Sequence, residues 1–356
     1  MLQAGSRPAW SEAGFSLRFD WLMISVRTWP NVVRRWFVDS TLAGPLATLG
    51  LVFILFSLFV PHFFGLRSLS GIVNAATLTG TLTVGITLLM ISGEFDLSVG
   101  ALVAVGGYLF AFNTMNGGSA AVAMALALLV PAMLGAVNGL ILIWTGIPSF
   151  IITLGTRSIF RGVTWVLSGG VLVQTLEELP IYAVFNGRLD LVNELLEGAN
   201  FRTSLLWLVG LALLCQYILF RSRYGNHVFA AGGHRGAALS QGVNVKRVKV
   251  VTFIISGALA GFTGVLLFSQ FGSVHVASGA GMELSAVAAA VVGGALLSGG
   301  SGNIWGALVG VLLISTLRTG VVLLDLPFIP ADNFEAVVGA SIIGAVILNH
   351  WIRSRG

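Results

Sequence analysis

The chain contains 356 residues, of which 56% are hydrophobic and only 9% are charged. Soluble domains carry about 25% charged residues, so this composition excludes a cytosolic enzyme, a disulfide-rich secreted domain and a disordered chain. The formal net charge of +5 is spread over separate clusters, and the single cysteine, Cys215, cannot form an internal disulfide. We predict an all-α, polytopic membrane protein that partners the lipid bilayer and no nucleic acid.

Residues 1–42 precede the first apolar run and carry five arginines, without the pattern of a cleaved signal peptide. Apolar residues recur at helical 4-3-4-3 spacing, at Phe15, Phe19, Leu22, Val26 and Trp29. This stripe predicts an amphipathic helix on the inner membrane surface, with a disordered arm as the alternative. We interpret 1–42 as a cytoplasmic N-terminal segment.

Long gaps between charged residues define the membrane spans, because a crossing helix needs about 20 apolar residues. The transmembrane domain is predicted over 43–351, followed by a cytoplasmic tail at 352–356. About ten spans are expected, or nine or eleven if a short segment is re-entrant: 43–63, 70–92, 98–114, 120–143, 149–168, 204–220, 250–270, 284–299, 304–324 and 334–351. The main outer loop is 169–203, and the longest interior loop is about 221–249.

Lysine and arginine set the orientation through the positive-inside rule. The N-terminal segment, the 221–249 loop and the tail together hold 13 basic residues, whereas the opposite side holds only Arg67, Arg188 and Arg202. This asymmetry predicts that both termini lie in the cytoplasm.

Two stretches match at an offset of 187 residues, each with an acid-Leu-Ser start and a Gly-Gly end. The first starts at Asp96 and the second at Glu283. Because they open the third and eighth spans, they enter the membrane from opposite sides. We predict an inverted 5+5 repeat, which places the substrate route between the halves. Chance similarity of Ala/Val/Gly-rich helices is the alternative.

The sequence lacks a phosphate-binding Gly-rich loop ending in Lys-Ser/Thr, a metal-type Cys/His cluster and a Gly-x-Ser-x-Gly elbow. We therefore expect no catalytic residues, no metal and no cofactor. Uphill transport would require an ion gradient or ATP hydrolysis on a separate chain.

Polar residues at membrane level are the candidates for the translocation pathway. They are Asn74, Thr77, Thr81, Asp96, Ser98, Arg161 and Glu283. Several of these residues could instead have purely structural roles. Asp96 and Ser98 could simply cap a helix, and the threonines could bond their own backbone. Arg157 and Arg161 share one helix face, and a pair with Asp96 is one option for them. Gly293–Gly302 is interpreted as a close-packing segment.

Four motifs, in order, carry a family resemblance. Residues 93–100, Gly-Glu-Phe-Asp-Leu-Ser-Val-Gly, resemble the Gly-Gly-Ile-Asp-Leu-Ser-Val-Gly signature of sugar permeases of the ABC importer class. Pro148-Ser149-Phe150-Ile151-Ile152-Thr153-Leu154-Gly155-Thr156 with Ile159-Phe160-Arg161-Gly162 resembles the family's next motif. Tyr224-Gly225, Ala231-Gly232-Gly233 and Gly242-Val243-Asn244-Val245 resemble its cytoplasmic loop. Gly281-Met282-Glu283-Leu284, with the later glycines, resembles its last block.

The resemblance implies the permease subunit of an ATP-driven importer in a bacterial inner membrane, carrying a monosaccharide or related polyol. Its implied partners are a cytoplasmic ABC ATPase, a periplasmic sugar-binding protein and a second permease copy or paralogue. The implied ATPase-coupling loop includes Gly232, Gly233, His234, Arg235, Gly236, Ala237, Gly242 and Asn244. Importers of nucleosides or branched-chain amino acids, or an ion-coupled secondary transporter, are the alternatives.

Two departures from the family pattern are evident. The family's Asn-Glu-Ala-Ala docking sequence reads His234-Arg235-Gly236-Ala237 here, so a basic residue replaces the acidic one. The family's Glu-Leu-Asp reads Glu283-Leu284-Ser285, which removes one carboxylate.

Overall fold

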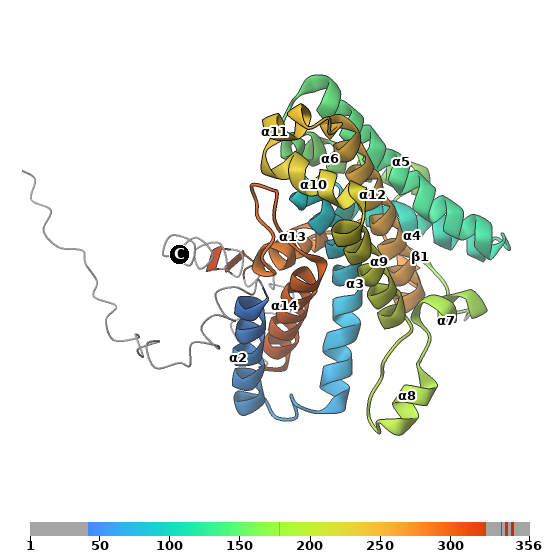
Figure 1. Cartoon of the computed structure of the whole chain (residues 1–356). Coiled ribbons are helices and arrows are strands. Elements are labelled where there is room, and N and C mark those ends of the chain that lie inside the picture. Colours follow the sequence, from blue (N-terminus) through green and yellow to red (C-terminus); the bar gives the residue numbers. More distant parts are fainter. Residues whose placement is uncertain (1–41, 178, 325–335, 337–338, 341–342, 345–356) are drawn as a thin grey trace, which may run out of the picture. The chain divides into compact units, whose positions relative to one another are not determined.

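A computed structural model describes residues 42–177 and 179–324, together with positions 336, 339, 340, 343 and 344. The predicted amphipathic helix, most of the tenth predicted span and the tail lie outside these residues. The described chain is built almost entirely from helices (Figure 1). The larger ones are α2 (Ala43–Phe59), α3 (Leu66–Ile91), α4 (Val99–Met115), α5 (Ala120–Thr145), α6 (Ser149–Ser168), α9 (Ser204–Arg221), α12 (Val245–Phe271), α13 (Met282–Val292) and α14 (Ile304–Leu324).

Every predicted span from 43–63 to 304–324 coincides with one of these helices, but their lengths differ. Five described helices are long and apolar enough to cross a membrane, namely α3, α5, α9, α12 and α14. The prediction of a complete helix over 284–299 is wrong. The helix α13 has 11 residues, which span about 16 Å, too short for a crossing of about 30 Å. It ends at Val292 because Gly293 and Gly294 turn the chain there, Gly294 with a φ of 94°.

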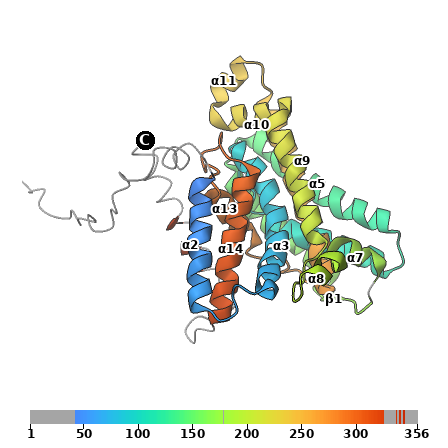
Figure 2. The same ribbon diagram turned by 60° about the horizontal axis from the view of Figure 1, so that its bottom comes forward.

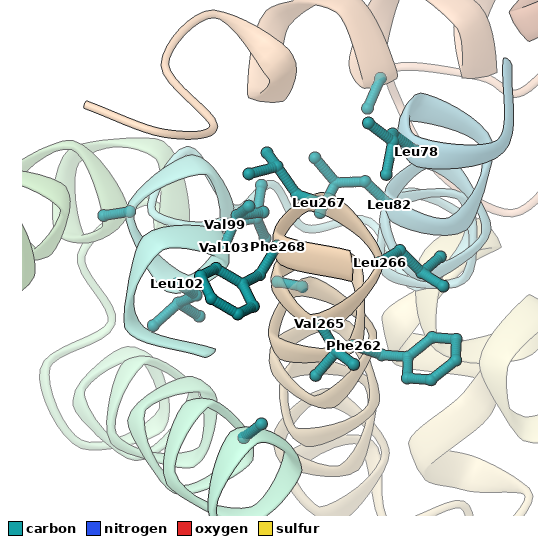
Figure 3. Packing of buried hydrophobic residues seen from close by; sticks show 14 of the residues in the cluster. Leu78, Leu82, Val99, Leu102, Val103, Phe262, Val265, Leu266, Leu267 and Phe268 are labelled. Carbon is teal, nitrogen blue, oxygen red and sulfur yellow. The ribbon is translucent and has the colours of Figure 1, made fainter. Parts of the chain in front are cut away.

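The helix α12 forms the centre of the packing, in contact with α3, α4 and α5. Figure 3 shows its buried side chains, among them Phe262 and Phe268, beside Leu82 of α3 and Leu102 of α4. Glycines let the backbones approach closely, as expected for helices packed in a membrane. A Cβ at Gly257 would lie 2.3 Å from the Pro131 carbonyl oxygen of α5.

The helix α14 packs against α2, α3 and α13, and Figure 2 shows α2, α14 and α3 side by side. The contact with the segment after α13 again uses glycines. A Cβ at Gly293 would lie 2.2 Å from the Gly306 carbonyl oxygen, and the reverse distance is 2.1 Å. The interpretation of Gly293 as a close-packing residue is therefore confirmed.

The connections carry the remaining elements. The predicted outer loop contains α7 (Pro180–Asn186) and α8 (Asp190–Leu195), and the predicted interior loop contains α10 (Arg223–Gly233) and α11 (Arg235–Ser240). A pair of two-residue strands, β1 (Val173–Gln174) and β2 (Ser273–Val274), is antiparallel, with Val173 opposite Val274. This pair and an isolated antiparallel bridge between Arg188 and Arg202 are the departures from the all-α prediction within the described residues.

Candidate functional site

The segment between α3 and α4 holds a buried polar network. The helix α3 stops at Ile91, and Gly93 takes a left-handed φ of 85° before the chain reaches α4. The Asp96 carboxylate accepts hydrogen bonds from the Ser98 backbone N–H at 2.8 Å and from its hydroxyl at 2.6 Å. Asn138 of α5 donates to the same hydroxyl at 2.9 Å. All three side chains are fully buried, so the network orders the start of α4 from inside the protein.

The second motif of the sequence holds the first one in place. The Ser149 hydroxyl accepts the Phe95 backbone N–H and the Thr153 hydroxyl accepts the Leu97 backbone N–H, both at 3.0 Å. An extended segment cannot satisfy its own N–H groups, so side chains of α6 do this instead. The hydrogen bonds join residues 54 and 56 positions apart, which the sequence pattern did not reveal.

Substitution of Thr153 by valine is expected to lower the free energy of unfolding by about 1–3 kcal/mol, because it leaves the Leu97 N–H without its acceptor. The matched control is Thr156→Val, a buried threonine whose hydroxyl donates only to its own helix. Thermal unfolding in detergent measures both variants. Equal losses would show that the hydroxyl of Thr153 contributes no more than that of Thr156.

Glu283 forms the second buried polar centre. Its carboxylate lies 2.7 Å from the Arg157 guanidinium of α6; Glu283 is fully buried and the Arg157 side chain is 28% exposed. Neither carboxylate oxygen receives an aligned hydrogen bond from the described residues, so the pair is held mainly by charge. Arg157 therefore pairs with Glu283 and not with Asp96, the partner that the sequence had suggested as one option. Two guanidinium nitrogens of Arg161 are buried without a hydrogen-bond partner among the described residues.

The two copies of the predicted repeat meet at Gly100. A Cβ at this position would lie 2.2 Å from a Glu283 carboxylate oxygen and 2.6 Å from the Gly279 carbonyl oxygen. Gly100 belongs to the first copy and Glu283 opens the second. The acid-Leu-Ser start of one short helix is thus packed against the first turn of the other.

The polar residues Asn74, Thr77 and Thr81 of α3 form hydrogen bonds within the protein. Thr77 and Thr81 are fully buried, and their hydroxyls donate to the backbone carbonyls of Asn74 and Thr77 at 2.7 and 2.8 Å. Asn74 donates to the Asn200 carbonyl oxygen at 2.7 Å, which ties α3 to the segment before α9. The threonines thus bond their own helix, as expected for membrane threonines, and the Thr77 hydroxyl is also within 3.4 Å of the Ser204 hydroxyl of α9.

Three glycine-containing segments meet at the end of α3, and we call this contact the glycine junction. It joins Gly93, Gly232 and Gly233 at the end of α10, and Gly299 and Gly300. The Gly300 N–H donates to the Ile91 carbonyl oxygen at 2.8 Å. A Cβ at Gly232 would lie 1.9 Å from that same oxygen. Three of the four motifs therefore converge here through backbone atoms.

Caps divide the interior loop into its helices. The His234 side chain accepts the Ala237 N–H at 3.1 Å and starts α11, which contains Arg235, Gly236 and Ala237. Gly242 has a φ of 77°, and Asn244 accepts the Arg247 N–H at 3.0 Å. The helix α12 consequently begins at Val245, within the predicted loop.

Beside these helices lies a cavity of about 190 Å³, lined by Glu94, Arg235, Lys246 and Lys249 among others. Glu94 is 6% exposed and forms an ion pair with Lys249. Sequence reasoning missed this pair because 155 positions separate its members. The signal available was that Lys249 is one of only two lysines and Glu94 one of two acids in the first motif. Among the described residues no group of three His, Cys, Asp or Glu could hold a metal ion.

The chain is similar to several transport proteins. Residues 68–346 match the family model described as "Branched-chain amino acid transport system / permease component". The ribose import permease protein RbsC of Escherichia coli (strain K12) is 31% identical over 319 residues, covering 88% of this chain and 96% of that protein. The D-allose transport system permease protein AlsC of the same strain is 34% identical over 278 residues, covering 75% and 81%. The RbsC protein of Bacillus subtilis (strain 168) is 32% identical over 307 residues, covering 86% and 92%. No solved structure matches the chain.

Proposed function

The chain belongs to the permease family of ABC importers, and from that premise we propose that it translocates a monosaccharide or related polyol as the membrane-spanning subunit of an ATP-driven importer. The observation that carries this proposal is the similarity to ribose and allose permeases over most of both chains. The description of the family model supports branched-chain amino acids as the second candidate substrate.

The partners follow from the importer type. ATP hydrolysis takes place on a separate cytoplasmic subunit, and a periplasmic binding protein delivers the solute. A second permease copy or paralogue completes the pathway. The protein lies in the bacterial inner membrane, with both termini on the cytoplasmic side, as the distribution of basic residues indicates.

The ten-span topology and the inverted repeat belong to the same proposal. Support comes from the acid-Leu-Ser sequences, which lie at the start of both short helices: directly before α4 in the first copy and within the first turn of α13 in the second. The contact of Gly100 with Glu283 also supports it, because inverted repeats place substrate routes where their broken helices meet. We assign Asp96, Ser98, Arg161 and Glu283 to the vicinity of this route.

The ATPase docks on α10 and α11 in this proposal. Leu239 of α11 is 54% exposed, which gives the short helix an apolar anchor for a soluble partner. The glycine junction connects the end of α10 directly to the segments that follow α3 and α13. Displacement of α10 by the ATPase is thus passed to both parts of the membrane domain.

Reconstitution in proteoliposomes tests the function. Together with its partner ATPase and binding protein, the chain is expected to accumulate labelled D-ribose or D-allose only when ATP is present. The Leu239→Asp variant is expected to reduce ATPase co-purification and uptake about tenfold, since burial of a leucine contributes about 1.5–3 kcal/mol.

The control for docking is Gln241→Asp, an exposed residue just beyond the same helix, which is expected to change both quantities less than twofold. Competition by unlabelled L-leucine, with none by sugars, would reassign the substrate to amino acids. Accumulation by the lone chain under a proton gradient, without ATP, would contradict the importer itself.

A further inference from the structure

The cavity at the start of α12 is lined by two chemically different groups of residues. One wall is the turn between α5 and α6, with the apolar residues Ile147 and Pro148. Arg235 and Lys246, both exposed, also line the cavity. Glu94, another lining residue, is already neutralised by Lys249. Three basic groups and one acidic group therefore leave two positive charges in excess, and Arg235 and Lys246 form no ion pair with the described residues.

The surface next to the apolar wall has the character of a lipid-facing surface at headgroup level. Trp144, at the end of α5, is 86% exposed, and Phe150 at the start of α6 is 52% exposed. Exposed tryptophan at the end of a membrane helix is typical of the interface between hydrocarbon and water. The cavity therefore opens where acyl chains could lie along α5 and α6 while a headgroup reaches the basic residues.

We propose that this cavity binds the headgroup of an anionic phospholipid, with its phosphate held by Arg235 and Lys246. Guanidinium and ammonium groups make strong, charge-assisted hydrogen bonds to phosphate oxygens. Basic pockets between membrane helices on the cytoplasmic side are where anionic headgroups bind. The apolar wall accounts for a lipid in preference to a free anion. Arg235 replaces the acidic residue of the family's docking sequence; in this proposal it holds the phosphate, while Leu239 of the same helix remains the anchor for the ATPase.

The test is native mass spectrometry of the whole chain, purified without any ATPase, with three probes: dioctanoylphosphatidylglycerol, dioctanoylphosphatidylcholine and inorganic phosphate. The wild type is expected to bind the phosphatidylglycerol probe at least tenfold more tightly than the phosphatidylcholine probe. The double variant Arg235→Gln and Lys246→Gln is expected to lose about tenfold in affinity for phosphatidylglycerol. If the double variant folds poorly, the single variants Arg235→Gln and Lys246→Gln replace it, and each is expected to lose part of the affinity for phosphatidylglycerol.

The matched control is Arg221→Gln with Arg223→Gln, which removes two exposed charges from the same basic segment but leaves the cavity lining intact. It is expected to change the affinity less than twofold. Equal losses in both double variants would overturn the proposal, as would equal binding of the two lipids. Competition by inorganic phosphate at comparable concentration would show a site for free anions instead. Unchanged binding of phosphatidylglycerol by the cavity double variant would likewise overturn the proposal. Because the assay contains no ATPase and no sugar, it stands apart from the proposed transport function.

Discussion

Replacement of Gly261 by valine is expected to lower the thermal stability of the membrane domain more than any other single change considered. A Cβ at this position would lie 2.1 Å from the Ala127 carbonyl oxygen and 2.7 Å from the Pro131 ring of α5. The helix α4 is also close to Gly261, because a Cβ at Gly106 would lie 2.4 Å from the Gly261 carbonyl oxygen. The helix α12 therefore cannot move toward α4 to make room for a side chain at position 261. An added side chain in a packed core costs about 1–3 kcal/mol, and more where the neighbouring atoms cannot move. Because the nearest neighbour here is a backbone oxygen, we expect the free energy of unfolding to fall by about 3 kcal/mol or more.

The measurement is thermal unfolding in detergent, and Gly162→Val on α6 is the control. A Cβ at Gly162 meets nothing within 4 Å in the described chain, while the small gain in intrinsic helix propensity from glycine to valine is the same for both substitutions. The control is expected to remain within about 1 kcal/mol of the wild type. A comparable shift in the two variants would show that close contact between α4, α5 and α12 contributes little.

Substitution of Arg157 by glutamine is expected to destabilise the protein by about 3 kcal/mol, because it leaves the Glu283 carboxylate buried without a counter-charge. The reverse change, Glu283→Gln, is expected to cost less than half as much. It leaves behind an arginine whose side chain is 28% exposed and can be solvated, whereas Glu283 is 0% exposed. Uptake in proteoliposomes is expected to fall in the same order.

The double variant Arg157→Gln, Glu283→Gln completes a cycle and separates the pair from its surroundings. Its stability is expected to exceed that of Arg157→Gln alone, because the unpaired buried charge has been removed. Additive losses in the double variant would mean that the two residues act independently, and the assignment of the pair as a link between α6 and α13 would be withdrawn.

Charge gaps located the helices well because an unpaired charge is costly in hydrocarbon, and this rule acts along the chain. The positions of α3, α5 and α14 follow from it. The rule failed where tertiary contacts shield short helices from lipid, as for α13, which has the composition of a span without its length. It also failed at the start of α12, because the cap provided by Asn244 is a local signal that the charge count ignores.

The candidate site was harder to anticipate because its partners come from distant positions. The sequence identified Asp96 and Glu283 as unusual for their depth. It did not indicate Asn138 beside the first, and it suggested Asp96 rather than Glu283 as the partner of Arg157. Ser149 and Thr153 belong to the second family motif, residues 148–156. Nothing in its spacing indicates that their hydroxyls accept N–H groups from the first motif. Their roles become visible only once α6 is packed against the start of α4.

At the glycine junction, Cα atoms of three segments touch with no side chains between them. At an ordinary interface, side chains can change rotamer and so absorb small movements. The glycine junction has no side chains to do this, so a shift of one segment displaces the other two by nearly the same amount. The junction also limits which substitutions its glycines can tolerate. Any residue larger than glycine at Gly232 would have to be accompanied by rearrangement of two other segments, and such paired changes seldom arise in a single step.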